Sequence, residues 1–98
     1  MGFLDQGKML LKAREVQKQL KNTEIEAKSA NGYVSVVFNA EMHVKKVELS
    51  DEAMQAEKRV LEQELQKTIA EGLSRAQAVA TEKTKDMMKD MNINLPGM

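Results

Sequence analysis

The sequence predicts a small α+β protein with the order helix, three antiparallel strands, long C-terminal helix. Three observations predict this order. Apolar residues have helical spacing near the N-terminus, alternate with polar residues between residues 23 and 49, and return to helical spacing from about residue 57. A chain of 98 residues is expected to form a single domain, 1–98.

The first helix is predicted over residues 4–21. Met9, Ala13, Val16 and Leu20 recur at steps of four, three and four, which places them on one stripe of a helix. Asn22 follows the last of these positions and ends the helical periodicity.

The pattern then changes to the period of two that is typical of strands, predicted at 23–29, 33–39 and 42–49. Between the first two strands, Asn31-Gly32 is a strong hairpin signal because both residues tolerate positive φ. A second turn is expected near residues 39–41.

The third strand changes parity in its middle. Met42 and Val44 share one face of an ideal strand, whereas Val47 and Leu49 take the opposite parity. The extra residue falls at Lys45-Lys46, which predicts a β-bulge there. The two lysines would also discourage pairing at an exposed sheet edge.

The last helix is predicted over residues 57–91 and would be roughly 50 Å long at about 1.5 Å per residue, followed by a loose tail at 92–98. One short sheet and one helix of about 18 residues cannot cover an apolar stripe of that length. We therefore expect a homodimer, the commonest symmetric assembly. Its expected interface residues are Val34, Val36, Phe38, Leu65, Ile69, Gly72 and Ala76.

The sequence lacks the motifs that are typical of most enzymes. There is no cysteine, no glycine-rich phosphate loop and no metal-spaced set of His and Cys, so we expect neither cofactor, metal nor small-molecule substrate. His43, the one histidine, falls on a predicted strand and is expected to be a packing or surface residue. No apolar run is long enough to span a membrane or form a signal peptide, which favours a cytoplasmic protein.

The positive charges are unevenly placed in a chain whose formal net charge is zero. Residues 1–21 carry five cations and two anions, and further lysines crowd the end of the last helix. In a sheet-centred α-β-β-β-α protein, the start of the first helix and the end of the last could lie at one extremity. Phosphate groups would bind well at such a site, because cations placed near phosphates release counterions. The alternative, with equal weight, is that these cations only form the solvated flanks of an amphipathic helix. The candidate DNA-binding residues are Lys8, Lys12, Arg14, Lys18, Lys83 and Lys85.

Over nearly its full length the chain resembles the YbaB/EbfC family of bacterial nucleoid-associated proteins. The resemblance rests on "MLLKAREVQKQL", "EIEAKSANGYVSVVFNAEMHVKKVEL", "EKRVLEQELQKTIAEGLSRAQAVATEK" and the final "LPG". Two positions depart from the family pattern: Ala40 stands where glycine is usual, and Ser50-Asp51 where Asp-Pro is common. The resemblance implies a tweezer-like homodimer that binds double-stranded DNA through helical projections at the nucleoid, with a chromosome-organising or gene-regulatory role.

Two other functions remain open at this point. Met87, Met88 and Met91 could form an adaptable apolar surface for another protein. Alternatively, the first helix could lie on an anionic membrane surface through its apolar stripe and lysine flanks, although the preferred expectation is no membrane partner.

Overall fold

The computed structural model describes residues 3–90. Its elements are α1 (Phe3–Asn22), β1 (Glu24–Lys28), β2 (Val34–Asn39), β3 (Val44–Leu49), a 3-10 turn η1 (Glu52–Gln55) and α2 (Lys58–Asp90). The three strands form one antiparallel sheet in the order β1-β2-β3. The predicted fold class is confirmed, while the predicted tail at 92–98 and the last residue of the helix predicted to reach 91 lie outside the described residues.

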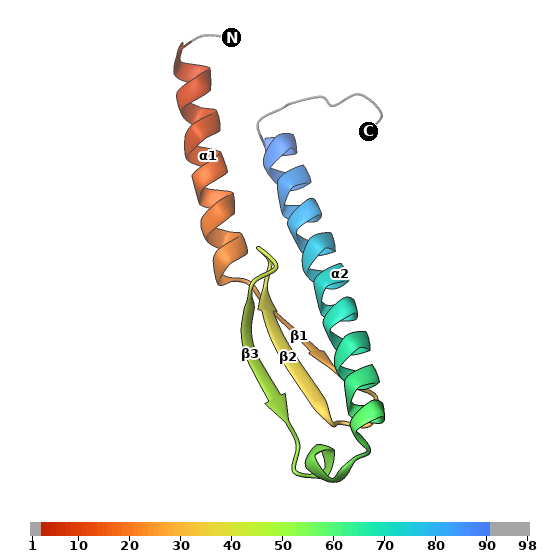
Figure 1. Ribbon diagram of the computed structural model, residues 1–98. Helices are drawn as coiled ribbons and strands as arrows, with labels where there is room; N and C mark the ends of the chain where they lie inside the picture. Colours follow the sequence, from red (N-terminus) through yellow and green to blue (C-terminus); the bar gives the residue numbers. More distant parts are fainter. Residues whose placement is uncertain (1–2, 91–98) are drawn as a thin grey trace.

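The molecule is elongated because both helices project beyond the sheet. α1 and the C-terminal half of α2 lie side by side at one extremity, and the sheet and η1 occupy the other (Figure 1). The long dimension is 62 Å, and the radius of gyration is 18.3 Å, against about 13 Å for a compact chain of this length. The start of α1 and the end of α2 lie at the same extremity, as expected from the sequence (Figure 1).

The β1–β2 hairpin closes at the predicted Asn31-Gly32 turn. Gly32 has a φ of +76°, the left-handed conformation that glycine adopts without steric cost. Asn31 contributes through its side chain instead: its Oδ1 accepts hydrogen bonds from Ser29 Oγ at 2.8 Å and from Tyr33 N at 3.1 Å. Ser29 Oγ in turn accepts a hydrogen bond from Val34 N at 3.0 Å, which fixes where β2 begins.

The second turn is longer than the sequence predicted. Asn39 is buried, and its Oδ1 accepts hydrogen bonds from Glu41 N and His43 N at 3.0 and 3.1 Å. The positive φ in this turn, +66°, falls on Met42. β3 therefore begins at Val44 rather than at residue 42, because the left-handed backbone at Met42 is incompatible with an extended strand.

The predicted bulge in β3 is confirmed. Val37 pairs with Lys46, whereas the next residue, Phe38, pairs with Val44, so Lys45 is the extra residue. The shift restores Val44, Val47 and Leu49 to a single face, the same face as the buried β2 residues with which they pair. Their parity change in the sequence thus has a direct structural cause.

The core lies between α2 and the sheet. Val34, Val36 and Phe38 of β2 are buried there and pack against Leu61 and Leu65 of α2. Farther along α2, the buried residues are Thr68, Gly72 and Ala76. Gly72 allows the close approach of α2, since its backbone faces the ring of Phe38.

This core corrects part of the predicted dimer interface. Val34, Val36, Phe38, Gly72 and Ala76 are buried within the single chain, so in this fold they have no surface to offer a partner. Leu65 is partly buried in the same core. Of the predicted interface residues, only Ile69 is clearly exposed, at 38%.

α1 is anchored to the sheet by its last turn. Leu20 packs with Val79 of α2 against buried Ile25, Ala40 and Ala76. The N–H of Ala40 lies within hydrogen-bond distance of two carbonyls at the end of α1, Leu20 O and Thr23 O, at 3.0 and 3.1 Å. This attachment directs the rest of α1 away from the sheet and alongside α2.

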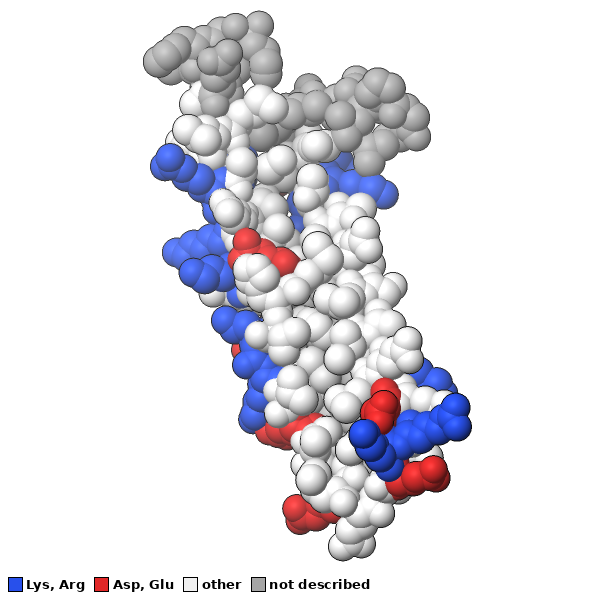
Figure 2. Space-filling view, in the orientation of Figure 1, with Lys and Arg blue, Asp and Glu red and all other residues white. Residues whose placement is uncertain are grey.

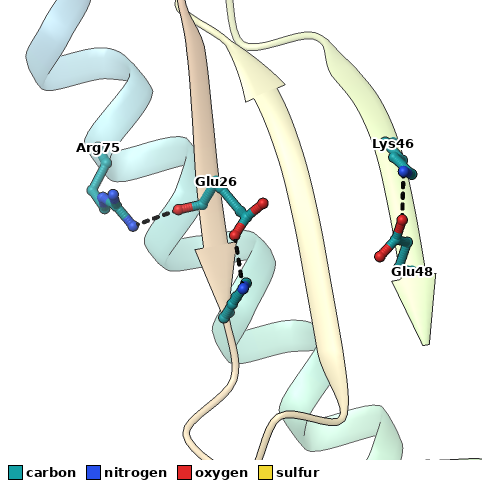
Figure 3. Close-up of polar contacts among 5 residues, drawn as sticks. Glu26, Lys46, Glu48 and Arg75 are labelled. Carbon is teal, nitrogen blue, oxygen red and sulfur yellow. Dashed lines mark hydrogen bonds and ion pairs between the residues drawn. The ribbon is translucent and has the colours of Figure 1, made fainter. Parts of the chain in front are cut away.

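The sheet face opposite α2 has charged side chains on both outer strands and half-buried Val37 on the central strand. It carries the exposed ion pairs Lys28–Glu26 on β1 and Lys46–Glu48 on β3 (Figure 3). Arg75 of α2 reaches the outer edge of β1, where its Nη1 donates a hydrogen bond of 2.8 Å to the Glu26 carbonyl oxygen. The β1 edge is thus partly capped by an arginine, and the β3 edge is interrupted by the lysine bulge.

Candidate nucleic-acid interface

A basic stripe runs along the exposed side of α1. Residues separated by three or four positions lie on neighbouring turns of a helix. Every side chain of the stripe is exposed to solvent, and among the described ion pairs none involves a cation of the stripe. We call this set the outer stripe: Lys8, Leu11, Arg14, Lys18 and Lys21.

The outer stripe winds around α1, and its central residues Leu11 and Lys18 face away from α2. Of the apolar stripe predicted from the sequence, Met9, Val16 and Leu20 are half-buried on the other side of the helix, whereas Ala13 is exposed. Five residues separate Leu11 from Val16, which corresponds to about 140° around an α-helix with 3.6 residues per turn. The apolar stripe therefore packs α1 onto the molecule and leaves the cations free to meet a ligand.

Lys12 and Lys83 occupy a different environment. Both are half-buried and line a cleft of about 120 Å³ between α1 and α2, together with Glu15, Asp86 and Asp90. Lys12 Nζ lies 3.6 Å from Glu15 Oε2. The carboxylates balance the two lysines, so this cleft is less suited to a polyanion than the outer stripe.

Lys85 is separate from both groups. It is exposed and lines a shallow depression along α2 with Glu82 and Thr81. The structure thus brings together three of the six predicted DNA-binding residues, Lys8, Arg14 and Lys18, and adds Lys21 to them. Lys21 was visible in the sequence as a cation three residues after Lys18, a helical spacing that assigns it to the same stripe.

The surface charge follows this division. Figure 2 shows Lys and Arg side chains along the α1 side of the molecule, while the band between that side and α2 is nearly free of charge. Acidic side chains gather toward the sheet end in the same view. The neutral chain therefore has an uneven surface charge: residues 1–21 carry five cations and two anions, whereas cations and acids lie together toward the sheet end.

The uncharged band contains an exposed apolar face. Val44, Val47 and Leu49 lie on the same side of the sheet as the core but are 41–54% exposed, because α2 covers β1 and β2 and leaves β3 open. On α2, Ile69 and Leu73 are 38% and 36% exposed. Apolar surface of this kind is typical of an interaction site. We call these five residues the apolar face.

Helical geometry places Ile69 and Leu73 beside β3. Arg75 marks the β1 side of α2, since it bonds to the Glu26 carbonyl. The buried residues Gly72 and Ala76 lie next around the helix, and Ile69 lies beyond them, about 120° from Arg75. The apolar groups of α2 and β3 therefore border the same surface.

The residues of the other two candidate functions are placed as follows. Met87 and Met88 are half-buried, with Met87 in the interhelical cleft, whereas Met91 lies outside the described residues. His43 is exposed in the β2–β3 turn. Within residues 3–90, no cluster of His, Cys, Asp or Glu could hold a metal ion, and no helix has the length and apolar character needed to cross a membrane.

Comparison with known proteins agrees with this geometry. A model of the YbaB/EbfC DNA-binding family matches residues 4–94. A nucleoid-associated protein of Prochlorococcus marinus (strain MIT 9515) is 30% identical over 90 residues, covering 88% of this chain and 74% of that protein. Another, from Hahella chejuensis, is 27% identical over 94 residues, covering 89% and 87%.

The fold has a close structural counterpart. The crystal structure of an uncharacterized protein, HP0035 from Helicobacter pylori, superposes with a TM-score of 0.78 at 21% identity, covering 90% of this chain and 98% of that one. Since the family model spans nearly all of the sequence, the chain belongs to the YbaB/EbfC DNA-binding family.

Proposed function

We propose that this protein is nucleoid-associated and binds double-stranded DNA as a homodimer, mainly through phosphate contacts from lysine and arginine on its helices. It would act in the cytoplasm, at the nucleoid, in chromosome organisation or gene regulation. The names of the curated relatives, which are nucleoid-associated proteins, support this proposal.

The outer stripe is the observation that carries the proposal. Four exposed cations lie along a projecting helix in a protein with no net charge. Lys12 and Lys83, which line the cleft between α1 and α2, lie near carboxylates and would contribute less to DNA binding. Lys and Arg in such positions neutralise phosphates and release counterions, which gives affinity with weak sequence preference.

The apolar face is the proposed contact between two copies. Pairing of sheet edges is disfavoured, because Arg75 caps the β1 edge and the Lys45 bulge interrupts the β3 edge. The uncharged surface between β3 and α2 has neither obstacle (Figure 2). Packing of two such faces would cover the apolar residues and give the dimer two outer stripes.

Salt-dependent binding to a mixed-sequence duplex tests the DNA-binding proposal. The logarithm of the affinity should fall steeply with the logarithm of salt concentration. The triple variant Lys8→Gln, Arg14→Gln, Lys18→Gln should flatten this slope by about one unit for each phosphate that is no longer neutralised. The matched control removes three exposed cations from α2: Lys58→Gln, Arg59→Gln, Lys67→Gln. Equal effects of the two triple variants would show that only overall charge matters.

Sedimentation velocity tests the dimer. The wild-type protein should sediment as a dimer, and Val47→Lys or Ile69→Lys should weaken it at least tenfold by burying an unpaired charge. Val60→Lys is the matched control, since Val60 is 40% exposed but lies nine residues from Ile69, half a turn around the helix. A monomeric wild-type protein would contradict the proposed assembly.

A further inference from the structure

Leu11 is an exposed apolar side chain in the middle of the outer stripe. It is 67% exposed, with Lys8 three residues before it, Arg14 three after it and Lys18 seven after it. It lies on the side of α1 away from α2, so packing within the chain does not explain it.

A second copy of the protein is a poor occupant for this site. The outer stripe carries four like charges, and the neighbouring acid Glu15, four residues after Leu11, is paired with Lys12, so two stripes facing each other would repel. The apolar face, where we propose that the copies meet, is formed by β3 and α2 instead. Charge complementarity therefore selects a polyanion as the ligand that meets Leu11.

The shape of the apolar contact favours DNA over a lipid surface. A helix that lies on a membrane buries a broad apolar side, but within residues 7–22 Leu11 is the single apolar member of the outer stripe, and exposed Leu10 is rotated from it by about 100°. The major groove of DNA admits an α-helix, and the methyl group of thymine is the apolar feature that side chains contact there.

We propose that α1 enters the major groove with its outer stripe and that Leu11 contacts thymine methyl groups. This inference rests on the proposed DNA-binding function and adds to it a preference for thymine-containing sites. The flanking cations hold the helix against phosphates, and Leu11 supplies the one base-dependent contact of the stripe.

The test compares two duplexes of the same mixed sequence, one with thymine and one with uracil replacing every thymine. Uracil keeps the hydrogen-bonding groups of thymine and lacks only the methyl group. The wild-type protein should bind the uracil duplex about fourfold more weakly, the effect of exposing one buried methyl group. Leu11→Ala should bind both duplexes equally. Leu10→Ala, the same change on the neighbouring residue, should keep the fourfold ratio.

Each other outcome overturns the inference in a distinguishable way. Equal wild-type affinity for the two duplexes would reject the methyl contact and leave DNA binding intact. An unchanged ratio in Leu11→Ala would assign the contact to another residue. Absence of duplex binding by the wild-type protein would reject the proposed function itself. Leu11-dependent binding to phosphatidylglycerol–phosphatidylcholine vesicles, without a uracil effect, would identify a lipid surface instead. Circular dichroism should show unchanged helix content in both variants.

Discussion

The ring of Phe38 lies against the backbone of Gly72, so closely that a Cβ atom added to Gly72 would come within 2.1 Å of Phe38 Cε2. This contact joins the end of β2 to the middle of α2. It sets the distance between helix and sheet, and with it the direction in which α2 extends beside α1.

Gly72→Ala is expected to destabilise the fold by about 1–3 kcal/mol. Alanine favours a helix over glycine by about 1 kcal/mol, but here the added methyl group would collide with a ring that is fully buried. Thermal unfolding at fixed protein concentration measures the difference in stability. Each kcal/mol of destabilisation should lower the Tm by about 4–8 °C.

Gly7→Ala in α1 is the matched control, because a Cβ at Gly7 would meet nothing within 4 Å. It should stabilise the protein by up to about 1 kcal/mol. Phe38→Leu combined with Gly72→Ala should recover part of the loss, since the smaller side chain makes room. Additive effects of these two substitutions would show that the contact is not the cause.

The same region shows how far the sequence pattern could predict the core. Leu61, Leu65, Ile69 and Leu73 recur at steps of four, which suggests a continuous apolar stripe. Each such step advances about 40° around a helix of 3.6 residues per turn, so Ile69 and Leu73 rotate out of the core. Thr68, Gly72 and Ala76 take the buried positions instead. Small or polar residues are preferred there only because the helix packs against the sheet, which the sequence pattern does not show.

Met42→Gly is expected to stabilise the protein by about 0.5 kcal/mol. Met42 has a φ of +66°, a conformation that costs a side-chain-bearing residue about 1–2 kcal/mol, partly offset by the greater unfolded-state entropy of glycine. Urea unfolding measures the change.

Ala40→Gly should destabilise by about 1 kcal/mol instead, because Ala40 is buried and its φ is not positive. The opposite order of these effects would place the strained residue elsewhere.

This turn was the least predictable part of the sheet. The alternation in the sequence extends through Met42, and glycine is expected at residue 40 from the family resemblance. The side chain of Asn39 instead binds the N–H groups of Glu41 and His43, which moves the left-handed residue to position 42. Hydrogen bonds between one side chain and two backbone groups do not change the periodicity of the sequence, so the pattern could not predict this turn.

The Lys46–Glu48 pair on the sheet face opposite α2 should show opposite pKa shifts. The hydrogen bond and the attraction between the two side chains raise the pKa of Lys46 above 10.5 and lower the pKa of Glu48 below 4.5. The contribution of Glu48 is therefore lost as pH falls through its lowered pKa, and that of Lys46 as pH rises through its raised pKa. Both groups are exposed, so salt should weaken the effect.

NMR titration of the Glu48 carboxyl group measures this shift. Lys46→Gln should return the pKa of Glu48 toward its usual value. Lys28→Gln should move it in the same direction by a smaller amount, since the charge of Lys28 is the weakest of the causes acting on Glu48. An unchanged pKa in Lys46→Gln would show that the pair does not form in solution.

The candidate site was predictable in part. Counting charges along the chain located the cations on the first helix, and helical spacing separates Arg14 and Lys18 from the apolar stripe. The pattern could not show that Lys12 faces Glu15 or that Lys83 lies among Asp86 and Asp90. Those environments depend on how α1 packs against a helix far along the chain, which neither helix specifies alone.

Thr68→Val is expected to stabilise the protein by about 1 kcal/mol. Thr68 is 2% exposed, and its Oγ1 has no hydrogen-bond partner among the described residues. A buried hydroxyl without a partner carries an uncompensated desolvation cost, and valine keeps the same shape and nearly the same helix propensity. Thr84→Val should bring no such gain, because Thr84 Oγ1 already donates to Ala80 O at 2.9 Å. Thr68→Ser, which keeps the hydroxyl and removes the methyl group, should destabilise. Loss of stability in Thr68→Val, measured by urea unfolding, would instead show that a buried water binds this hydroxyl.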